Sequence, residues 1–293
     1  MKLKIFLTGA SGFIGKNFIE QRKIKYSIFS PTHKQLDLTD RMSVNRYFQN
    51  NGPFDVVLHF ANRGGKRSDT HTPDILKTNL VMFFNLLKNK RHFKKMIYTG
   101  TGAEYDKSRG IKLVKETDFA KHIPQDEHSF SKYLCSQLTE EAENVYCLRL
   151  FGIFGPYEDY RLRFISNMLC KYIAKLPLTV RQNAYFDYLC INDFITILDY
   201  FFVTKPKHKF YNVGSGKRIS LLSLAEKINK LNEYSLPLRV KQKALNKEYT
   251  CNNSRLLGEL KDFKFTHIDD SIRELYNWYK KNWSNVDIQW LNN

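Results

Sequence analysis

A short apolar run near the start of the chain leads into Thr8-Gly9-Ala10-Ser11-Gly12-Phe13-Ile14-Gly15. The glycines recur at every third position, and the pattern of a helix follows them directly. Glycine suits this turn because the backbone needs unusual dihedral angles and must approach a pyrophosphate closely, while the helix packs tightly on its strand. The helix also offers free N–H groups and its positive dipole end to phosphate. The stretch therefore predicts a dinucleotide-binding loop.

Short apolar strands alternate with amphipathic helices as far as about residue 150, which is the pattern of a parallel α/β sheet. The connections between parallel strands are then expected to be right-handed. We expect strands at residues 4–7, 26–29, 56–60, 95–99 and 145–150, and helices at residues 12–21, 43–50, 73–88 and 129–144.

The regularity weakens beyond Phe151, where polar loops surround a helix near residues 164–174, a strand around 178–181 and a helix at 221–231. We therefore expect two packed units. Residues 1–150 form an NAD(P)-binding Rossmann domain with a doubly wound parallel sheet. Residues 151–293 mainly form a smaller C-terminal substrate-binding α/β domain, and we expect some of its segments to return to the Rossmann core.

Composition excludes several other classes of protein. The net charge of +18 is dispersed between apolar segments, so we expect no nucleic-acid partner. No apolar run reaches the roughly 18–20 residues of a membrane span, and we expect a cytoplasmic protein without a membrane partner. The five cysteines are scattered, with no metal-like spacing, so we expect buried thiols and no metal site.

The loop after the second expected strand bears on cofactor choice. A fold that prefers NAD would carry an acidic side chain about 20 residues after the first glycine, to bind the ribose 2′-hydroxyl. This chain has Thr32, His33 and Lys34 there, which can accept a 2′-phosphate through charge-assisted hydrogen bonds. We expect NADP(H), while NAD(H) stays open.

Several segments resemble the NAD-dependent epimerase/dehydratase family, the extended branch of the short-chain dehydrogenase/reductases. The glycine loop is similar to its TGxxGxxG motif, and residues 57–62 (VLHFAN) resemble its HxAA strand end. Asn79 resembles the asparagine of the following helix. Thr101 stands at the position of the family's catalytic hydroxyl. The resemblance implies cofactor contacts from Gly9, Ser11, Gly12, Phe13, Ile14, Gly15, Thr32, His33, Lys34, Asp37, Leu38, Phe60, Ala61, Asn62, Asn79, Thr99 and Lys132.

The family uses a Tyr-x-x-x-Lys pair in which one helical turn places both side chains on one face. The lysine holds the nicotinamide ribose and lowers the pKa of the phenol. Here the segment reads HSFSKY, so Lys132 is present but His128 occupies the tyrosine position. Three hypotheses stay open: His128 transfers the proton with Thr101, another donor such as Glu104 or Tyr105 does so, or the chain binds nucleotides without the family's chemistry.

The dehydratases of the family usually carry an Asp-Glu pair directly after the hydroxyl residue. Gly102 and Ala103 follow Thr101 here, so 4,6-dehydration is not expected. Ketone reduction and epimerisation remain, because both need only proton transfer at one oxygen.

The resemblance continues at residues 148–156 (LRLFGIFGP), 186–193 (FDYLCIND) and 210–216 (YNVGSG after Phe210). Phe186 replaces the arginine that many members place on the nucleotide diphosphate, and Arg181, Arg163 or Arg255 would supply that charge. The resemblance implies substrate contacts from Glu104, Tyr105, Arg163, Asn167, Arg181, Phe186 and Arg255.

These expectations favour an NADP(H)-dependent reductase of a nucleoside-diphosphate 4-keto sugar in surface polysaccharide synthesis. The alternatives are a nucleotide-sugar 4-epimerase with tightly bound NAD and a nucleotide-binding relative with lost or altered catalysis. Family members often form homodimers through a four-helix bundle, and the helix that follows His128 suits such an interface.

Overall fold

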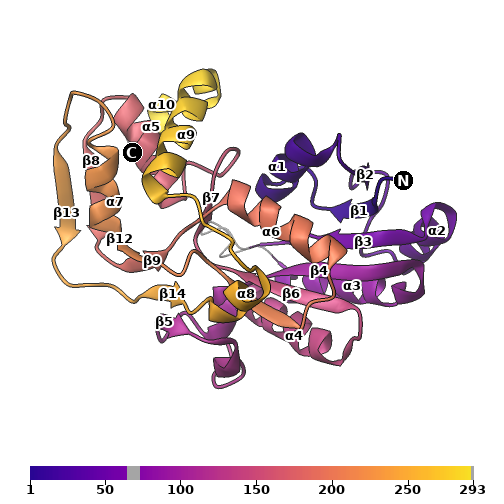
Figure 1. Cartoon of the computed structure of the whole chain (residues 1–293). Helices are drawn as coiled ribbons and strands as arrows, with labels where there is room; N and C mark the ends of the chain where they lie inside the picture. The colour runs from indigo at the N-terminus through magenta and orange to yellow at the C-terminus, as the bar shows by residue number, and fades with distance from the viewer. Residues whose placement is uncertain (65–72, 292–293) are drawn as a thin grey trace.

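The computed structural model describes residues 1–64 and 73–291, and a six-stranded parallel sheet lies at its centre (Figure 1). The strand order is β11-β6-β4-β3-β1-β2. All five neighbouring pairs run parallel, which confirms the doubly wound α/β fold. The strands are β1 (Lys4–Thr8), β2 (Ser27–Phe29), β3 (Phe54–His59), β4 (Phe93–Thr101), β6 (Val145–Leu150) and β11 (Phe210–Val213).

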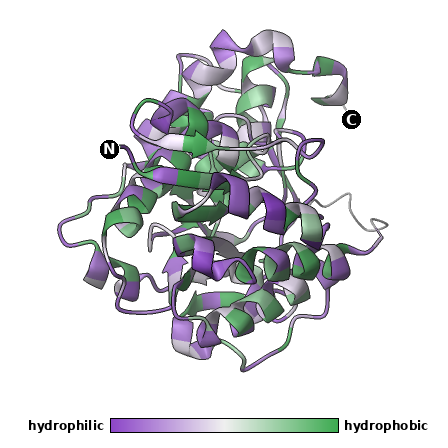
Figure 2. Ribbon diagram, turned by 90° about the vertical axis from the view of Figure 1, so that its right-hand side faces the viewer, coloured by the Kyte–Doolittle hydropathy of each residue, from purple (hydrophilic) through white to green (hydrophobic). Residues whose placement is uncertain are grey.

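Helices cover both faces of this sheet (Figure 1). On one face, α1 (Phe13–Arg22) packs beside α6 (Ile191–Val203). On the other face lie α2 (Arg41–Asn51), α3 (Ile75–Leu87) and α4 (Glu127–Glu141). The helices carry both hydrophilic and hydrophobic residues (Figure 2), and their apolar sides form two buried clusters against the strands. Burying apolar side chains from both faces is the main stabilisation of such a fold.

Two segments of the later half of the chain belong to this central layer. Strand β11 pairs with β6, and α6 packs on α1. The chain therefore crosses from the smaller part of the molecule back to the sheet after residue 190. Strand β11 and helix α6 are therefore the segments beyond residue 151 that return to the central sheet.

Helix α4 begins two residues before the expected start at Ser129. Asp126 caps the helix, because its side chain accepts a hydrogen bond of 3.0 Å from the backbone N–H of Ser129. His128 consequently lies in the first turn, one turn before Lys132. The cap fixes where the helix that carries Lys132 begins.

The smaller part of the molecule combines short strands with helices around its own apolar cluster. A four-stranded sheet has the order β12-β9-β14-β5, and β10 pairs with β7 and β13 with β8. The strands are β5 (Ile111–Val114), β7 (Ile153–Phe154), β8 (Leu178–Gln182), β9 (Tyr185–Asp187), β10 (Leu189–Cys190), β12 (Arg218–Ser220), β13 (Leu238–Gln242) and β14 (Tyr249–Cys251). Its helices are α5 (Phe164–Ile173), α7 (Leu221–Ile228), α9 (Ile268–Lys281) and α10 (Ile288–Leu291), whereas α8 (Ser254–Glu259) packs on β11. The 3₁₀ turns are η2 (Lys90–His92) before β4, η3 (Gly102–Tyr105) after it, η4 (Glu116–Asp118) and η5 (Trp283–Asn285).

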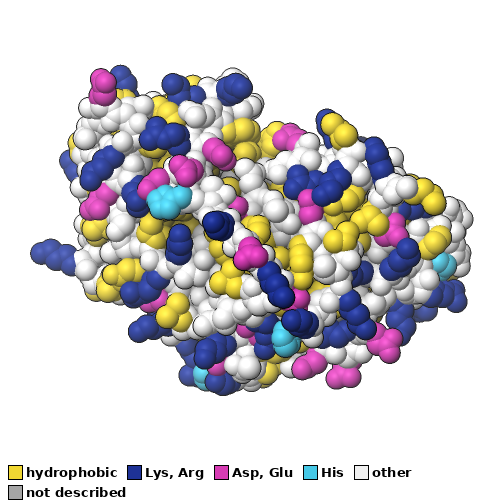
Figure 3. Space-filling model, viewed as in Figure 1, with side chains coloured by type: hydrophobic (Ala, Val, Ile, Leu, Met, Phe, Trp, Pro, Cys, Tyr) yellow, Lys and Arg dark blue, Asp and Glu magenta, His cyan; other side chains and the backbone are white. Residues whose placement is uncertain are grey.

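Basic side chains are scattered over the visible face and are interspersed with acidic ones (Figure 3). Within residues 1–64 and 73–291, no helix has both the length and the apolar character needed to cross a membrane.

Candidate active site

The glycine loop connects β1 to α1 and makes a close backbone contact with the end of β3. Gly9 has φ +72°, and a Cβ atom there would lie 2.6 Å from the backbone nitrogen of Ala61. At Gly15 a Cβ atom would lie 2.3 Å from the carbonyl oxygen of Gly9. Only glycine fits both positions, so the sequence requires this tight turn.

The loop presents the start of α1 without a side-chain cap. Gly12 is the N-cap residue and makes no side-chain cap hydrogen bond, and Ser11 beside it is exposed. The N–H groups of the first turn, at Phe13 and Ile14, have no partner within the helix. A glycine cradle at a helix N-terminus fits the pyrophosphate of a dinucleotide.

Thr8 joins this loop to the end of β3. Its hydroxyl accepts hydrogen bonds from the backbone N–H groups of Phe60 (3.2 Å) and Ala61 (3.1 Å). It also lies 2.9 Å from Nδ1 of His59. Burial, with the nearby charge of Lys132, lowers the pKa of His59 to about 3, so this imidazole stays neutral. Its role is structural, because it binds the hydroxyl of Thr8.

Asn79 on α3 holds the chain just after β3. Its side chain accepts from the N–H of Arg63 at 2.8 Å and donates to the carbonyl of Arg63 at 3.0 Å. It also donates to the hydroxyl of Ser131 on α4 at 3.1 Å. Asn79 is 5% exposed, so it holds the residues after β3 from the interior of the protein. Asn62 is exposed and donates to the carbonyl of Gly64.

Lys132 and Thr99 meet at the carboxyl end of β4. The ammonium of Lys132 donates to the carbonyl of Thr99 at 2.9 Å and lies 4.5 Å from the centre of the Tyr98 ring. The lysine is 6% exposed, and burial lowers its pKa. Thr101 lies two residues further along β4, so its side chain is on the same side of the strand as that of Thr99.

Thr101 is held by contacts from three directions. Its N–H donates to the carboxylate of Glu104 at 2.9 Å, and its hydroxyl accepts from the N–H of Ala103 at 3.3 Å. The same hydroxyl lies 3.2 Å from the phenolic oxygen of Tyr249, on β14. Tyr249 is a residue of the site that the motifs did not indicate, because it lies 148 positions away in the chain.

Glu104 and Tyr105 differ from the expectation that they contact substrate. The carboxylate of Glu104 is fully buried, 2.7 Å from Nε of Arg149 and 2.6 Å from the hydroxyl of Ser136. The hydroxyl of Tyr105 donates to Asn212 at 2.7 Å, also in the interior. Both side chains lie in the interior, where they form a buried polar network with Ser136, Arg149 and Asn212.

Arg163 lies close to the aromatic residues of the smaller part of the molecule. Its charge opposes the raised pKa values that burial gives Tyr249, Tyr188 and Glu158. Asn167 follows one turn along α5, with its N–H bonded to the carbonyl of Arg163 at 2.8 Å.

Phe186 contributes an aromatic ring rather than a charge. Its ring centre lies 5.8 Å from that of Tyr249 and 5.7 Å from that of Tyr188. Arg181 is exposed on β8, which pairs with β13.

Arg255, which was expected near the diphosphate, has partners within the protein. It donates to the carbonyl of Phe210, the first residue of β11, and its Nε lies 3.7 Å from the carboxylate of Glu116. Successive strand pairings place Phe210 level with Thr8, so Arg255 lies beside the edge strand β11, four strands away from the glycine loop. Its guanidinium therefore holds α8 and η4 together.

The loop after β2 contains the residues expected near the ribose phosphate and the adenine. His33 and Lys34 are exposed, and the hydroxyl of Thr32 donates to the side chain of Gln35 at 3.0 Å. Asp37 accepts two hydrogen bonds from Thr39, which lower its pKa. Leu38 packs partly buried against the core cluster beneath the sheet.

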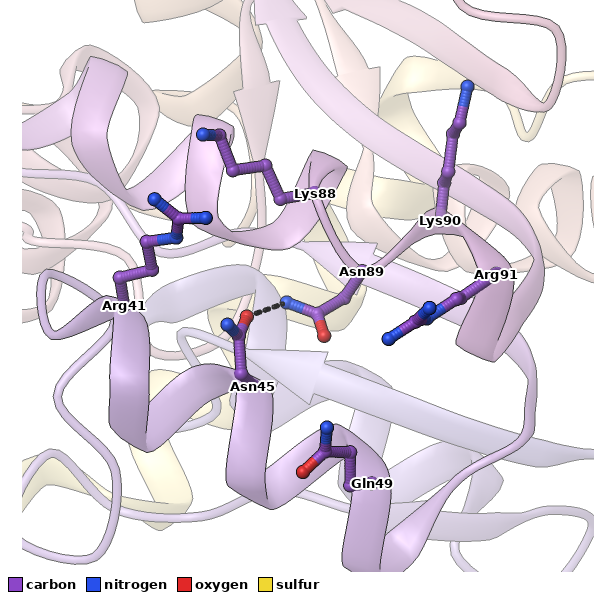
Figure 4. Close-up of a pocket in the computed structure, with 7 residues that line it drawn as sticks. All are labelled: Arg41, Asn45, Gln49, Lys88, Asn89, Lys90 and Arg91. Atoms are coloured by element: carbon purple, nitrogen blue, oxygen red, sulfur yellow. Dashed lines mark hydrogen bonds between the residues drawn. The ribbon is translucent and has the colours of Figure 1, made fainter.

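A separate surface pocket lies beside α2 and the turn after α3 (Figure 4). The side chain of Asn89 donates to that of Asn45 at 2.8 Å, and basic side chains surround this bond. The pocket is near the amino end of β4, opposite Thr101, so it is not part of the site described above. Its lining residues are Arg41, Asn45, Gln49, Lys88, Asn89, Lys90 and Arg91.

Comparison with known proteins identifies the class of this site. A family model described as "NAD dependent epimerase/dehydratase family" matches residues 5–214. GDP-L-colitose synthase of Yersinia pseudotuberculosis is 26% identical over 191 residues, which cover 59% of this chain and 61% of that enzyme.

Two solved structures share the fold. UDP-glucose 4-epimerase of Thermotoga maritima, solved with UDP-glucose, has a TM-score of 0.81 and 17% identity, and the match covers 95% of this chain and 99% of that one. GDP-mannoheptose C4 reductase of Campylobacter jejuni, solved with NADP, has a TM-score of 0.80 and 18% identity, with 95% and 98% covered.

Proposed function

The chain belongs to the NAD-dependent epimerase/dehydratase family and is an NAD(P)-dependent enzyme that modifies nucleotide sugars, and from that premise we propose that it reduces a nucleoside-diphosphate 4-keto sugar. The relatives include enzymes whose names describe this kind of chemistry, among them the C4 reductase of Campylobacter jejuni. Surface polysaccharide synthesis is the process in which such a product would be used.

The arrangement around Thr101 is the observation that carries this proposal. Thr101 and Lys132 lie at the carboxyl end of β4, the same end of the sheet at which the glycine loop follows β1. The residue directly after Thr101 is Gly102, which carries no carboxylate. The ring of Phe151 leaves no room for a side chain there, because a Cβ atom at Gly102 would lie 2.5 Å from that ring. A dehydratase needs an acid and a base at that point, whereas a ketone reductase needs one proton donor.

The chain's own residues would divide the work of reduction. When bound, the dinucleotide would supply hydride to the ketone carbon. Lys132 holds the nicotinamide ribose, and Thr101 donates a hydrogen bond to the ketone oxygen. His128, or a neighbouring donor, protonates that oxygen as it becomes an alkoxide. His128 lies one turn before Lys132 on α4, so both side chains are on one face of the helix.

NADP(H) is the cofactor we propose. Thr32, His33 and Lys34 follow β2 without an acidic residue among them, and His33 and Lys34 are exposed to solvent. A hydrogen bond to a charged group is worth about 1.5–3 kcal/mol, which corresponds to roughly a 10- to 100-fold preference for the 2′-phosphate. NAD(H) would lack that contact.

The sugar and its nucleotide would lie between β4 and the smaller part of the molecule. We propose that Arg163 and Asn167 on α5 contact the substrate together with Phe186, and that Arg181 contributes charge. Arg163 is the best supported of these, because its electrostatic influence reaches Tyr249, which itself contacts Thr101.

A 4-epimerase with retained NAD is the second candidate. Its support is the likeness to UDP-glucose 4-epimerase and the same Thr101–Lys132 arrangement. Epimerisation requires the site to remove a proton as well as to donate one, and the sugar must turn over between the two hydride transfers.

We propose a homodimer in which α3 and α4 form the interface. These two helices pack side by side, and each carries partly exposed apolar residues. On α3 these include Leu80 and Phe84, and on α4 Phe130, Leu134 and Leu138.

The direct test is NADPH oxidation at 340 nm with GDP-, dTDP- and UDP-linked 4-keto-6-deoxyhexoses. We expect turnover with at least one of them and a lower rate with NADH. Lys132→Ala should abolish it, whereas Lys121→Ala should not, because Lys121 forms an exposed ion pair with Asp118. Absence of NADPH oxidation with the whole panel would contradict the proposed reaction.

A further inference from the structure

Tyr249 brings a phenol into contact with the hydroxyl of Thr101. The two oxygens lie 3.2 Å apart, although Tyr249 belongs to β14 in the four-stranded sheet and Thr101 ends β4 of the central sheet. This contact joins the two parts of the molecule at the point where the sugar would react.

The surroundings of Tyr249 fix the direction of its side chain. Its ring centre lies 5.1 Å from that of Phe151 and 5.8 Å from that of Phe186. A Cβ atom at Gly102 would lie 2.7 Å from the phenolic oxygen. The absence of a side chain at residue 102 therefore makes room for this hydroxyl beside Thr101.

Thr101 and Tyr249 together have one hydroxyl proton that is not used in the hydrogen bond between them. The hydroxyl of Thr101 already accepts from the N–H of Ala103. Between Thr101 and Tyr249, one O–H donates to the other oxygen, which leaves the second O–H available to a further acceptor. A phenol, with an ordinary pKa of about 10, is a much stronger acid than an aliphatic alcohol. Tyr249 is the member of the pair that can release a proton.

We propose that Tyr249 is the proton donor of the reduction and acts beside Thr101, in place of the tyrosine that the helix lacks at residue 128. This inference rests on the proposed function and names its acid. His128 then lies at the start of α4 without donating the proton.

The step is balanced as follows. The ketone carbon gains hydride from the reduced nicotinamide, and the electron pair of the C=O π bond moves to the oxygen. The O–H bond of Tyr249 breaks, a new O–H bond forms on the sugar, and the nicotinamide is left oxidised. Water returns the proton to the tyrosinate after the product alcohol leaves. Thr101 donates to the phenolic oxygen of Tyr249, rather than to the ketone, and stabilises the negative charge that develops on the phenol.

The electrostatics favour donation over removal of a proton. Burial raises the pKa of Tyr249 to about 12, while the hydrogen bond with Thr101 and the charge of Arg163 lower it and Glu104 and Cys251 raise it. The phenol is therefore protonated throughout the neutral range. Arg163 offsets part of the negative charge when tyrosinate forms. A base for epimerisation would need a pKa nearer to neutrality.

The test compares three variants by steady-state kinetics with NADPH and the reactive 4-keto sugar of the panel above. Tyr249→Phe should lower kcat by about 10²- to 10⁴-fold with little change in KM, because it removes only the donor. Thr101→Val combined with Tyr249→Phe should add little to the larger single loss, since the hydroxyls act as one unit. Tyr185→Phe is the matched control. It removes a phenolic hydroxyl from neighbouring β9, where the ring packs against Arg218.

The pH profile separates Tyr249 from His128. With Tyr249 as donor, kcat for reduction should be constant from roughly pH 6 to 9, because the phenol keeps its proton. With an imidazole donor, kcat would fall as the pH rises past the ordinary histidine value of about 6.5. His128→Ala should change kcat by less than about tenfold, well below the roughly 10²- to 10⁴-fold contribution of a general acid.

A readout independent of turnover is the ¹³Cζ resonance of Tyr249 in protein labelled at tyrosine ring carbons, identified by its loss in Tyr249→Phe. Addition of oxidised cofactor and the product nucleotide sugar should move it. An unmoved resonance, or full kcat in Tyr249→Phe while the wild type turns over, would overturn the role of Tyr249 and leave the proposed reduction standing. No turnover by the wild type would overturn both.

Discussion

Lys132 shows how the position of one side chain depends on its neighbours. Its ammonium is buried, yet it is held by the carbonyl of Thr99 and the ring of Tyr98. The same charge helps to keep His59 neutral, so His59 and Thr8 can bind each other and fix the loop after β3. One buried cation therefore supports both the reacting end of the site and the strand end beside the cofactor.

The ion pair of Glu104 and Arg149 should dominate the local stability. Both side chains are fully buried, 2.7 Å apart, and the arginine also lies 4.1 Å from the ring centre of Phe119. Glu104→Gln leaves the guanidinium without its counter-charge, so we expect the free energy of unfolding to fall by about 3–5 kcal/mol.

Urea denaturation measures this effect, and Glu226→Gln on the exposed side of α7 provides the control. A loss below about 1 kcal/mol, the value typical of an exposed pair, would contradict the importance of the buried pair. Because Glu104 also binds the N–H of Thr101, the variant should lose activity as well.

Gly9 and Gly258 allow a comparison between a glycine that the backbone geometry requires and one that an alanine can replace. Gly9→Ala places a methyl group 2.6 Å from the nitrogen of Ala61 at φ +72°. We expect lower stability and the loss of dinucleotide binding, since the loop must move to admit the methyl group. Calorimetric titration with NADPH and NADH measures the binding.

Gly258→Ala is the matched control. Gly258 lies in α8, and nothing is within 4 Å of a Cβ atom there. Alanine should stabilise this helix by about 0.5–1 kcal/mol and leave cofactor binding unchanged. Wild-type affinity in Gly9→Ala would show that the loop does not bind the pyrophosphate.

Glu158, in the loop before α5, should make stability depend on pH. Burial raises its pKa from 4.5 to about 8, although a hydrogen bond from Ser166 and the charge of Arg163 oppose this. The carboxyl group is therefore protonated in the folded protein at neutral pH and ionised in the unfolded chain. Because the folded pKa is the higher one, its favourable contribution is complete below about pH 4.5 and is lost as the pH rises to about 8.

Glu158→Gln removes this titration and keeps the shape of the side chain. The unfolding free energy of the wild type should fall relative to that of the variant by a few kcal/mol between roughly pH 5 and 8, at about 1.4 kcal/mol per pKa unit. Thermal or urea melts across this range measure the difference. A constant difference would mean that Glu158 is ionised in the folded state.

The assembly of the whole molecule is testable at one exposed ring. Phe84 on α3 is 39% exposed. If α3 and α4 form the dimer interface, Phe84→Asp should convert a dimer to monomer in light scattering coupled to gel filtration, because it places charge in an apolar contact. Val203→Asp at the end of α6 is the control, since Val203 is 73% exposed on another surface. A dimer that survives Phe84→Asp would place the interface elsewhere.

Local patterns predicted the central layer of the fold well. Strand β6 has the expected bounds, residues 145–150, because a largely apolar run between polar turns, broken only by Arg149, is a strong signal. The glycine loop was recognised because its requirement is local. By contrast, α9 and β14 were not predicted, since α9 mixes many charges with its apolar face and β14 is only three residues long.

The candidate site was predicted where it depends on local chemistry and missed where it depends on distant contacts. Thr101 and Lys132 follow from motifs. Tyr249 does not, because only the folded chain brings β14 to β4. Glu104 looked available in the sequence, but the fold buries it against Arg149. A sequence pattern cannot show which polar groups of a site face solvent and which complete the core.

The fate of labelled hydride distinguishes reduction from epimerisation. The enzyme would be incubated with NADPH deuterated at C4 and with each 4-keto nucleotide sugar, and the product analysed by mass spectrometry and NMR. We predict an alcohol that carries one deuterium at C4 of the sugar, with one NADP⁺ formed per product. An epimerised sugar without deuterium and without net cofactor oxidation would contradict reduction, as would a deuterium at any other carbon.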